Sequence, residues 1–191
     1  MKQKDLAVLI LAAGTSSRLG ESKQLLEYKG ESLLQIAVKK ALTLTNNVYV
    51  VLGDEKQRCE KELENYKLNT LFNKNYKKGL GTSISCGIKT LKEFDYTMIM
   101  LCDQPFIPLS HLESLVENKS EKKIVTSLYL ETLKKSVPAI FPKIYYKQLE
   151  ELNKDFGARY LLQNYETIDI KLDKNFSIDI DTIEDVKKFL N

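Results

Sequence analysis

Residues 6–23 read LAVLILAAGTSSRLGESK, an apolar run that leads directly into a turn of small residues. The run Leu6–Leu11 is typical of a buried strand, and the turn begins at Ala12. Small residues let backbone N–H groups approach phosphate oxygens closely, and Arg18 and Lys23 add positive charge nearby. This stretch therefore predicts a strand, a turn and a site for a nucleoside triphosphate.

Two well-known phosphate loops do not fit this turn. Gly14 and Gly20 are separated by residues 15–19, one residue more than a P-loop allows, and Glu21 stands where that motif has its lysine. The stretch also lacks the Gly-x-Gly-x-x-Gly spacing of a dehydrogenase. A glycine-containing turn that merely joins a strand to a helix is the alternative.

The composition indicates one globular domain over residues 1–191, with 43% hydrophobic and 29% charged residues. The net charge of +3 is too small to favour nucleic acid or an anionic membrane as a partner. Cys59, Cys86 and Cys102 form no Cys-x-x-Cys pair, and no signal segment is recognisable, so we expect a reduced, cytoplasmic protein. The longest apolar stretch, residues 6–13, is far shorter than the roughly 20 residues of a membrane-spanning helix, and no membrane association is expected.

Apolar runs and helix-like segments alternate along the chain. The predicted strands are Leu6–Leu11, Val48–Leu52 and Tyr96–Leu101. Ser32 and Asp54 precede helical patterns as their expected caps, and Gly79 opens a third helix. This alternation predicts an α/β fold, with a mostly parallel, twisted sheet and helices on both of its faces.

Asp103 lies directly after the third predicted strand and is followed by Gln104 and Pro105. Open α/β sheets bind ligands at the carboxyl ends of their strands. An aspartate there can hold Mg²⁺ while nucleotide phosphates complete the oxygen shell of the metal. A turn in which Asp103 only hydrogen-bonds its own backbone, stiffened by Pro105, fits the spacing equally well.

The segment Gly79–Ser83 is a second candidate for contact with a ligand. It opens the third helix, so the positive end of that helix and the hydroxyls of Thr82 and Ser83 would face the sheet edge. A hydroxyl that only caps the helix is the alternative.

The second half of the chain offers further candidates. The apolar segment Lys135–Pro142 is either an edge strand or the wall of a pocket. Asp155 can cap a short helix and leave Arg159 to pair with a carboxylate or to meet an anion. Asp179 and Asp181 alternate in a predicted strand, so both would project to one face, where two carboxylates can complete a metal site or simply be solvated.

Ordered blocks over nearly the whole chain resemble those of the nucleotidyltransferases that modify molybdopterin. The blocks are Leu11–Gly14, Ser17–Gly20, Lys23–Leu26 with Gly30, Gly79–Ser83, Asp103–Pro105, Val137–Ala139, Asp155–Arg159 and Asp181–Asp185. Ser22 stands where sugar-phosphate enzymes of this superfamily typically have proline, and guanylyl-transferring members usually have glycine in place of Ala13. The sequence therefore resembles the molybdenum cofactor cytidylyltransferase family.

This resemblance implies a nucleotide-diphospho-sugar transferase-like, Rossmann-like fold and a Mg²⁺-dependent reaction. The terminal phosphate of molybdenum-loaded molybdopterin would attack the α-phosphorus of CTP and yield the cytosine dinucleotide cofactor and pyrophosphate. Asp103 and Asp181 would hold the metal, and Lys23, Arg18 and Asp103 would be the catalytic residues. The implied nucleotide-binding residues are Leu11, Ala12, Ala13, Gly14, Arg18, Lys23, Gly53, Gly81, Ser83 and Asp103.

One departure leaves the acceptor open. Ser136 and Val137 stand where the best-known cofactor cytidylyltransferases have Gly-His, and this variant resembles relatives grouped with purine catabolism and xanthine dehydrogenase maturation. An apo molybdenum hydroxylase is therefore a candidate partner. Guanylyl transfer, or transfer to another phosphorylated acceptor, is the alternative within the superfamily. A non-catalytic, cofactor-binding maturation factor is the alternative of another class.

Overall fold

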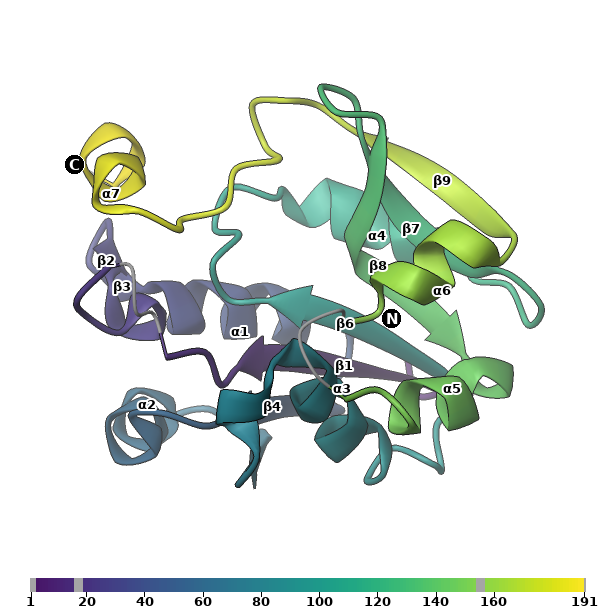
Figure 1. The fold of residues 1–191 in the computed structure, drawn as a ribbon, viewed down its shortest axis with the longest axis horizontal. Helices are drawn as coiled ribbons and strands as arrows, with labels where there is room; N and C mark the ends of the chain where they lie inside the picture. Colours follow the sequence, from purple (N-terminus) through teal and green to yellow (C-terminus); the bar gives the residue numbers. More distant parts are fainter. Residues whose placement is uncertain (1–2, 16–18, 154–156, 191) are drawn as a thin grey trace.

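The computed structural model describes residues 3–15, 19–153 and 157–190. Its main element is a seven-stranded sheet in the order β5-β4-β1-β6-β8-β7-β9 (Figure 1). The strands are β1 (Leu6–Ala12), β4 (Val48–Leu52), β5 (Asn69–Phe72), β6 (Tyr96–Leu101), β7 (Ile124–Tyr129), β8 (Lys134–Pro142) and β9 (Thr167–Leu172). A separate hairpin pairs β2 (Glu27–Tyr28) with β3 (Glu31–Ser32).

Strand β1 lies between β4 and β6 and is parallel to both, so that Ala12 pairs with Leu52 and Leu11 with Leu101. Strands β5, β7 and β9 follow the same direction. Among the described strands of this sheet, only β8 is antiparallel to its neighbours, β6 and β7. The mostly parallel sheet predicted from the sequence is confirmed.

Helices cover both faces of the sheet, as predicted. They are α1 (Leu33–Leu44), α2 (Lys56–Leu63), α3 (Leu80–Ile88), α4 (Leu109–Glu117), α5 (Tyr146–Glu150), α6 (Arg159–Asn164) and α7 (Ile183–Phe189), with 3-10 helices η1 (Lys23–Leu25), η2 (Tyr76–Lys78) and η3 (Lys143–Tyr145). Within the described part of the chain, no helix is both long and apolar enough to span a membrane.

Side chains of β1 point alternately into two apolar clusters, because successive strand residues face opposite sides of a sheet. Val8 and Ile10 pack with residues of α1, α2 and α4 on one face. Leu9 and Leu11 pack with residues of α3, α5 and α6 on the other. All of β1 is buried, which explains why its sequence is an uninterrupted apolar run.

The predicted helix caps have different outcomes. Ser32 caps α1 as expected, with its Oγ accepting the backbone N–H of Gln35 at 3.2 Å. The cap predicted at Asp54 is wrong, because α2 begins after Glu55, which has a positive φ and makes no side-chain cap. The Asp54 carboxylate instead accepts a hydrogen bond from the Tyr76 hydroxyl at 3.4 Å.

Two predictions for the second half need correction. The segment Lys135–Pro142 belongs to β8, which is an interior strand and not an edge strand. Residues 177–182 form no strand. Instead, Ile180 donates its backbone N–H to the carbonyl oxygen of Asp103 at 2.9 Å, and its buried side chain packs into a third apolar cluster with Leu19, Leu26 and Leu33. These contacts hold the segment across the loops that follow β1 and β6.

Candidate active site

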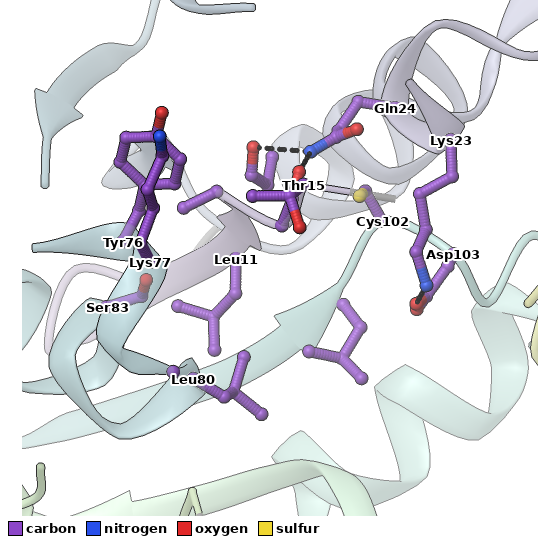
Figure 2. A pocket seen from close by; sticks show the side chains of 15 residues that line it. Leu11, Thr15, Lys23, Gln24, Tyr76, Lys77, Leu80, Ser83, Cys102 and Asp103 are labelled. Carbon is purple, nitrogen blue, oxygen red and sulfur yellow. Dashed lines mark hydrogen bonds and ion pairs between the residues drawn. The ribbon is translucent and has the colours of Figure 1, made fainter. Parts of the chain in front are cut away.

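A cavity of about 530 Å³ lies at the carboxyl ends of β1 and β6. We call it the first cavity. The turn Leu11–Thr15 lines it together with Lys23, Gln24 and Asp103, and Tyr76, Lys77 and Ser83 lie across from Lys23 and Asp103 (Figure 2). The turn predicted as a nucleotide site therefore lines a crevice at the strand ends, where folds of this kind bind their ligands.

Gln24 holds the turn in place. Its side chain is almost fully buried, and its Nε2 donates to the carbonyl oxygens of Ala12 and Gly14, both at 2.9 Å. The 3-10 helix η1 presents Lys23 and Gln24 in different directions, with the lysine toward Asp103 and the amide toward the turn (Figure 2). Gln24 was given no role in the sequence analysis, because a glutamine beside a lysine carries no distinctive spacing.

Gly53 lies behind the turn. A Cβ atom at Gly53 would come within 2.6 Å of the carbonyl oxygen of Ala13 and 2.7 Å of the Tyr76 side chain. Only glycine lets both groups pack this closely, and real Cβ atoms do not make such short contacts. Among the described residues that line the first cavity, neither Gly53 nor Gly81 is included, so a direct nucleotide contact by either stays a prediction.

Lys23 joins the two aspartates that the sequence analysis singled out. Its Nζ lies 2.6 Å from Asp103 Oδ2 and 2.7 Å from Asp181 Oδ1. Burial alone would lower the pKa of Lys23, but Asp103 and Asp181 outweigh it and raise that pKa above its ordinary value. The Lys23 ammonium thus stays charged between two carboxylates that belong to segments 78 residues apart, residues 103 and 181.

The Asp103 and Asp181 carboxylates suit a divalent cation whose coordination shell is completed by a bound ligand. Asp103 Oδ1 is buried and makes no hydrogen bond with any of the described residues, which leaves it as an acceptor for a ligand or a metal. Within the described ranges, no group of three or more His, Cys, Asp or Glu side chains is placed to hold a metal. A metal here would need oxygens from a bound nucleotide as further ligands, which suits Mg²⁺.

The start of α3 supplies the wall opposite Lys23. Gly79 precedes the helix without a side-chain cap, so neither hydroxyl serves as the N-cap. Thr82 Oγ1 donates to the carbonyl oxygen of Gly79 at 2.9 Å, and Ser83 Oγ accepts from Asn73 Nδ2 at 3.0 Å. Of the two, Ser83 lines the first cavity.

A second cavity of about 450 Å³ adjoins the first and shares Leu11, Leu80 and Leu101 with it. We call it the second cavity. Its lining includes Tyr129 and Val137 from the β7–β8 hairpin, Arg159 at the start of α6, and Asp179. The segment Lys135–Pro142 is therefore both an interior strand and, through Ser136 and Val137, a pocket wall.

Gln104 anchors the polar side of the second cavity. Its buried Nε2 donates to the Tyr129 hydroxyl at 2.8 Å and to Asp179 Oδ1 at 2.9 Å, and the Tyr129 hydroxyl donates to the carbonyl oxygen of Val137 at 3.0 Å. Asp103 and Gln104 are consecutive, yet Asp103 lines the first cavity and Gln104 bonds to Tyr129 and Asp179, which line the second. Desolvation and then the charge of Asp103 raise the pKa of Asp179 to about 6.

Arg159 is exposed at the rim of the second cavity. Among the described residues, no carboxylate forms an ion pair with it, so the ion pair considered in the sequence analysis is not found there. Its guanidinium is available to an anion in the cavity. Arg18 and Asp155, which the sequence analysis also named, lie outside the described residues.

The sequence of the chain matches a known family. The profile of the MobA-like NTP transferase domain matches residues 8–168. The chain is also 31% identical over 180 residues to the purine catabolism protein PucB of Bacillus subtilis (strain 168). This alignment covers 86% of this chain and 83% of PucB.

Two solved structures share the fold. The complex of Rv0371c with manganese from Mycobacterium tuberculosis H37Rv has a TM-score of 0.83 at 19% identity and covers 97% of both chains. The molybdopterin-guanine dinucleotide biosynthesis protein A of Archaeoglobus fulgidus has a TM-score of 0.69 at 19% identity and covers 95% of both chains. At these identities, the similarity concerns the fold alone.

Proposed function

The chain belongs to the MobA-like NTP transferase domain family, and from this membership we propose that it transfers CMP from CTP to molybdenum-loaded molybdopterin. The products would be molybdopterin cytosine dinucleotide and pyrophosphate. The observation that carries this proposal is the position of Lys23 between Asp103 and Asp181 at the side of the first cavity. This arrangement supports the proposal because it gathers two carboxylates suited to a metal and an ammonium suited to a triphosphate beside one cavity.

In this proposal, Asp103 and Asp181 hold Mg²⁺, which would neutralise charge on the phosphates of the bound nucleotide. Lys23 then exchanges its carboxylate partners for triphosphate oxygens. The anionic triphosphate oxygens would then replace the two carboxylates as the negative charges that keep Lys23 protonated. Arg18 is proposed as the second cation on the triphosphate.

The nucleotide would occupy the first cavity. Leu11, Ala12, Ala13 and Gly14 would contact its base and ribose, and the start of α3, with Gly81 and Ser83, would close over it. The preference for CTP rests on Ala13, since the guanylyl-transferring relatives usually have glycine there. Gln24 supports this assignment indirectly, because it fixes the carbonyl groups on both sides of Ala13.

The second cavity is the proposed acceptor site. It adjoins the first cavity, so a phosphate bound near Arg159 could be presented toward the nucleotide. Its apolar floor, formed in part by Ile84 and Ile99, suits a flat heterocycle better than a fully polar sugar. The similarity to the purine catabolism protein PucB agrees with the resemblance at Ser136 and Val137 to relatives grouped with purine catabolism. From that resemblance we infer a molybdopterin-type acceptor and an apo molybdenum hydroxylase as the recipient of the product.

The chemistry needs no covalent enzyme intermediate. An oxygen of the acceptor phosphate forms a bond to the α-phosphorus of CTP. The bond between that phosphorus and the oxygen that bridges it to the β-phosphorus breaks, and this oxygen leaves with pyrophosphate. The protein aligns the two substrates in the adjoining cavities, and its cations stabilise the negative charge of the leaving pyrophosphate. Alignment and charge stabilisation are the main sources of catalysis in phosphoryl-type transfers.

The test is a transfer assay with purified protein, Mg²⁺, molybdenum-loaded molybdopterin and CTP, GTP or ATP supplied separately. Pyrophosphate and the dinucleotide product are quantified, the latter by mass. Selective formation of the cytosine product supports the proposal, and the guanine product overturns the base assignment. Nucleotide binding without pyrophosphate from this acceptor contradicts the proposal and favours a maturation factor or another acceptor.

A further inference from the structure

Lys40 is a half-buried lysine of α1 that has carbonyl oxygens as partners and not carboxylates. Its Nζ donates to the carbonyl oxygen of Pro105 at 2.6 Å and to that of Ile107 at 2.7 Å. Among the described residues, no acidic side chain forms an ion pair with it. The ammonium therefore joins α1 to the loop that follows β6.

An ammonium in this position has a free-energy cost, because it is removed from water without a counter-ion. Burial lowers the pKa of Lys40 to about 8. The neighbouring Lys39 is instead exposed and has a counter-ion, because its Nζ lies 2.6 Å from Glu31 Oε1. The two charge-assisted hydrogen bonds to Pro105 and Ile107 are what offsets the cost at Lys40.

The loop that Lys40 holds joins Asp103, which lines the first cavity, to the segment that carries Asp181 and to α7. It begins at Asp103, whose carbonyl oxygen accepts the backbone N–H of Ile180, the residue before Asp181. The ring of Phe106 packs edge-on against Tyr28, with ring centroids 5.4 Å apart, and at a tilt against Phe189 of α7, with centroids 6.0 Å apart. Displacement of this loop would move Asp103 and the segment that carries Asp181 together.

We propose that Lys40 is a positioning residue that fixes the loop 103–107 and thereby the spacing of the Asp103 and Asp181 carboxylates. This inference rests on the proposed function, because it assigns those carboxylates to a metal–nucleotide complex. Lys40 touches neither the nucleotide nor the metal. It acts through the backbone, as residues that orient the ligands of a metal do.

The experiment compares the full-length variants Lys40→Met, Lys40→Arg and the matched control Lys39→Met. The readouts are the affinity for CTP with Mn²⁺ and without metal, amide hydrogen exchange in peptides covering residues 103–107, and kcat and KM for transfer. We expect Lys40→Met to weaken the Mn²⁺-dependent affinity and lower kcat by roughly 10- to 100-fold, with faster exchange in the loop. Metal-free CTP affinity should stay unchanged, Lys40→Arg should recover part of the loss, and Lys39→Met should behave as wild type.

The proposal is overturned if Lys40→Met lowers only the melting temperature and leaves the metal-dependent affinity and the loop exchange unchanged. If Lys40→Met does not fold, Lys40→Gln replaces it in the same readouts. The glutamine keeps an NH₂ group as a donor, so the loss should be smaller. Wild-type behaviour of Lys40→Gln would also overturn the proposal. Failure of the proposed function looks different: wild-type protein would then give no pyrophosphate with CTP and the acceptor, while exchange in the loop still distinguishes Lys40→Met from Lys39→Met.

Discussion

The two cavities differ in how their charged side chains are held before any ligand binds. In the first cavity, Lys23 is enclosed between Asp103 and Asp181. In the second, Arg159 is exposed and has no ionic partner among the described residues. A ligand of the first cavity must exchange partners with existing charges, whereas an anion in the second would gain a new partner.

This difference predicts different consequences of substitution. Groups of the first cavity are preorganised, so their loss should reduce the rate of the chemical step. Arg159 of the second cavity would make its contact only with the ligand, so its loss should weaken binding. The comparison is tested below by removing one group at a time.

The largest effect is expected for Lys23→Ala. Without this ammonium, the developing charge on pyrophosphate would lose a cation that we propose stabilises it, and kcat should fall by about 10³-fold. The measurement is turnover at saturating CTP and Mg²⁺. Lys39→Ala, which removes an exposed lysine of α1, is the control and should retain normal turnover. Near-normal turnover of Lys23→Ala would remove the distinction between the two cavities.

Asp103→Asn should lower kcat by about 100-fold and raise the concentration of divalent cation needed for half-maximal activity, because an amide is a poorer ligand than a carboxylate. The matched control is Asp95→Asn. Asp95 precedes β6 and Asp103 follows it, so the two aspartates lie at opposite ends of one strand. An unchanged requirement for the cation in Asp103→Asn would contradict the assignment of this residue.

Arg159→Ala sharpens the comparison from the other side. We expect the KM for the acceptor to rise about tenfold, which corresponds to the loss of a charge-assisted contact of about 1.4 kcal/mol, while the KM for CTP stays unchanged. Initial rates with each substrate varied separately provide the measurement. Arg58→Ala, in α2, removes an exposed arginine that pairs with Glu55 and serves as the control. A rise in the KM for CTP would show that the guanidinium serves the first cavity.

The smallest effect concerns stability and pH. Burial lowers the pKa of Lys40 from its ordinary 10.5 to about 8, so between these values the unfolded chain binds more protons than the folded one. The free energy of unfolding of the wild type should therefore rise relative to Lys40→Met by about 1–2 kcal/mol from pH 8 to 10.5, after allowance for solvent screening. Urea unfolding of both proteins across this range tests the sign. The free energy of unfolding of the wild type relative to Lys39→Met should show no such rise over this pH range.

The features that the sequence predicted correctly are those encoded locally. Strand β1 reads as an apolar run because it is buried on both faces, and α1 starts at Ser32 because the hydroxyl can cap it. The resemblance to known blocks pointed to Lys23, Asp103 and Asp181, which the structure brings together.

The features that were missed depend on contacts between distant segments. The alternation around Asp179 predicted a strand, but Ile180 bonds to the backbone at Asp103 instead of joining the sheet. Asp54 was predicted as a helix cap, whereas its carboxylate meets the hydroxyl of Tyr76. The roles of Gln24 and Lys40 consist of hydrogen bonds to backbone carbonyl groups, which no pattern of residue types reveals.

Strand β8 enters the sheet as the returning arm of a hairpin with β7, antiparallel to its neighbours. Val137 and Ser136 of this arm line the second cavity, while the first cavity is built on the parallel strands β1 and β6. Ser136 and Val137 precede the part of β8 that pairs with β6, which runs from Ala139 to Pro142. One strand is therefore divided along its length: the half that pairs with β6 is fixed by the apolar core, and the half that lines the second cavity sets the size and polarity of that cavity.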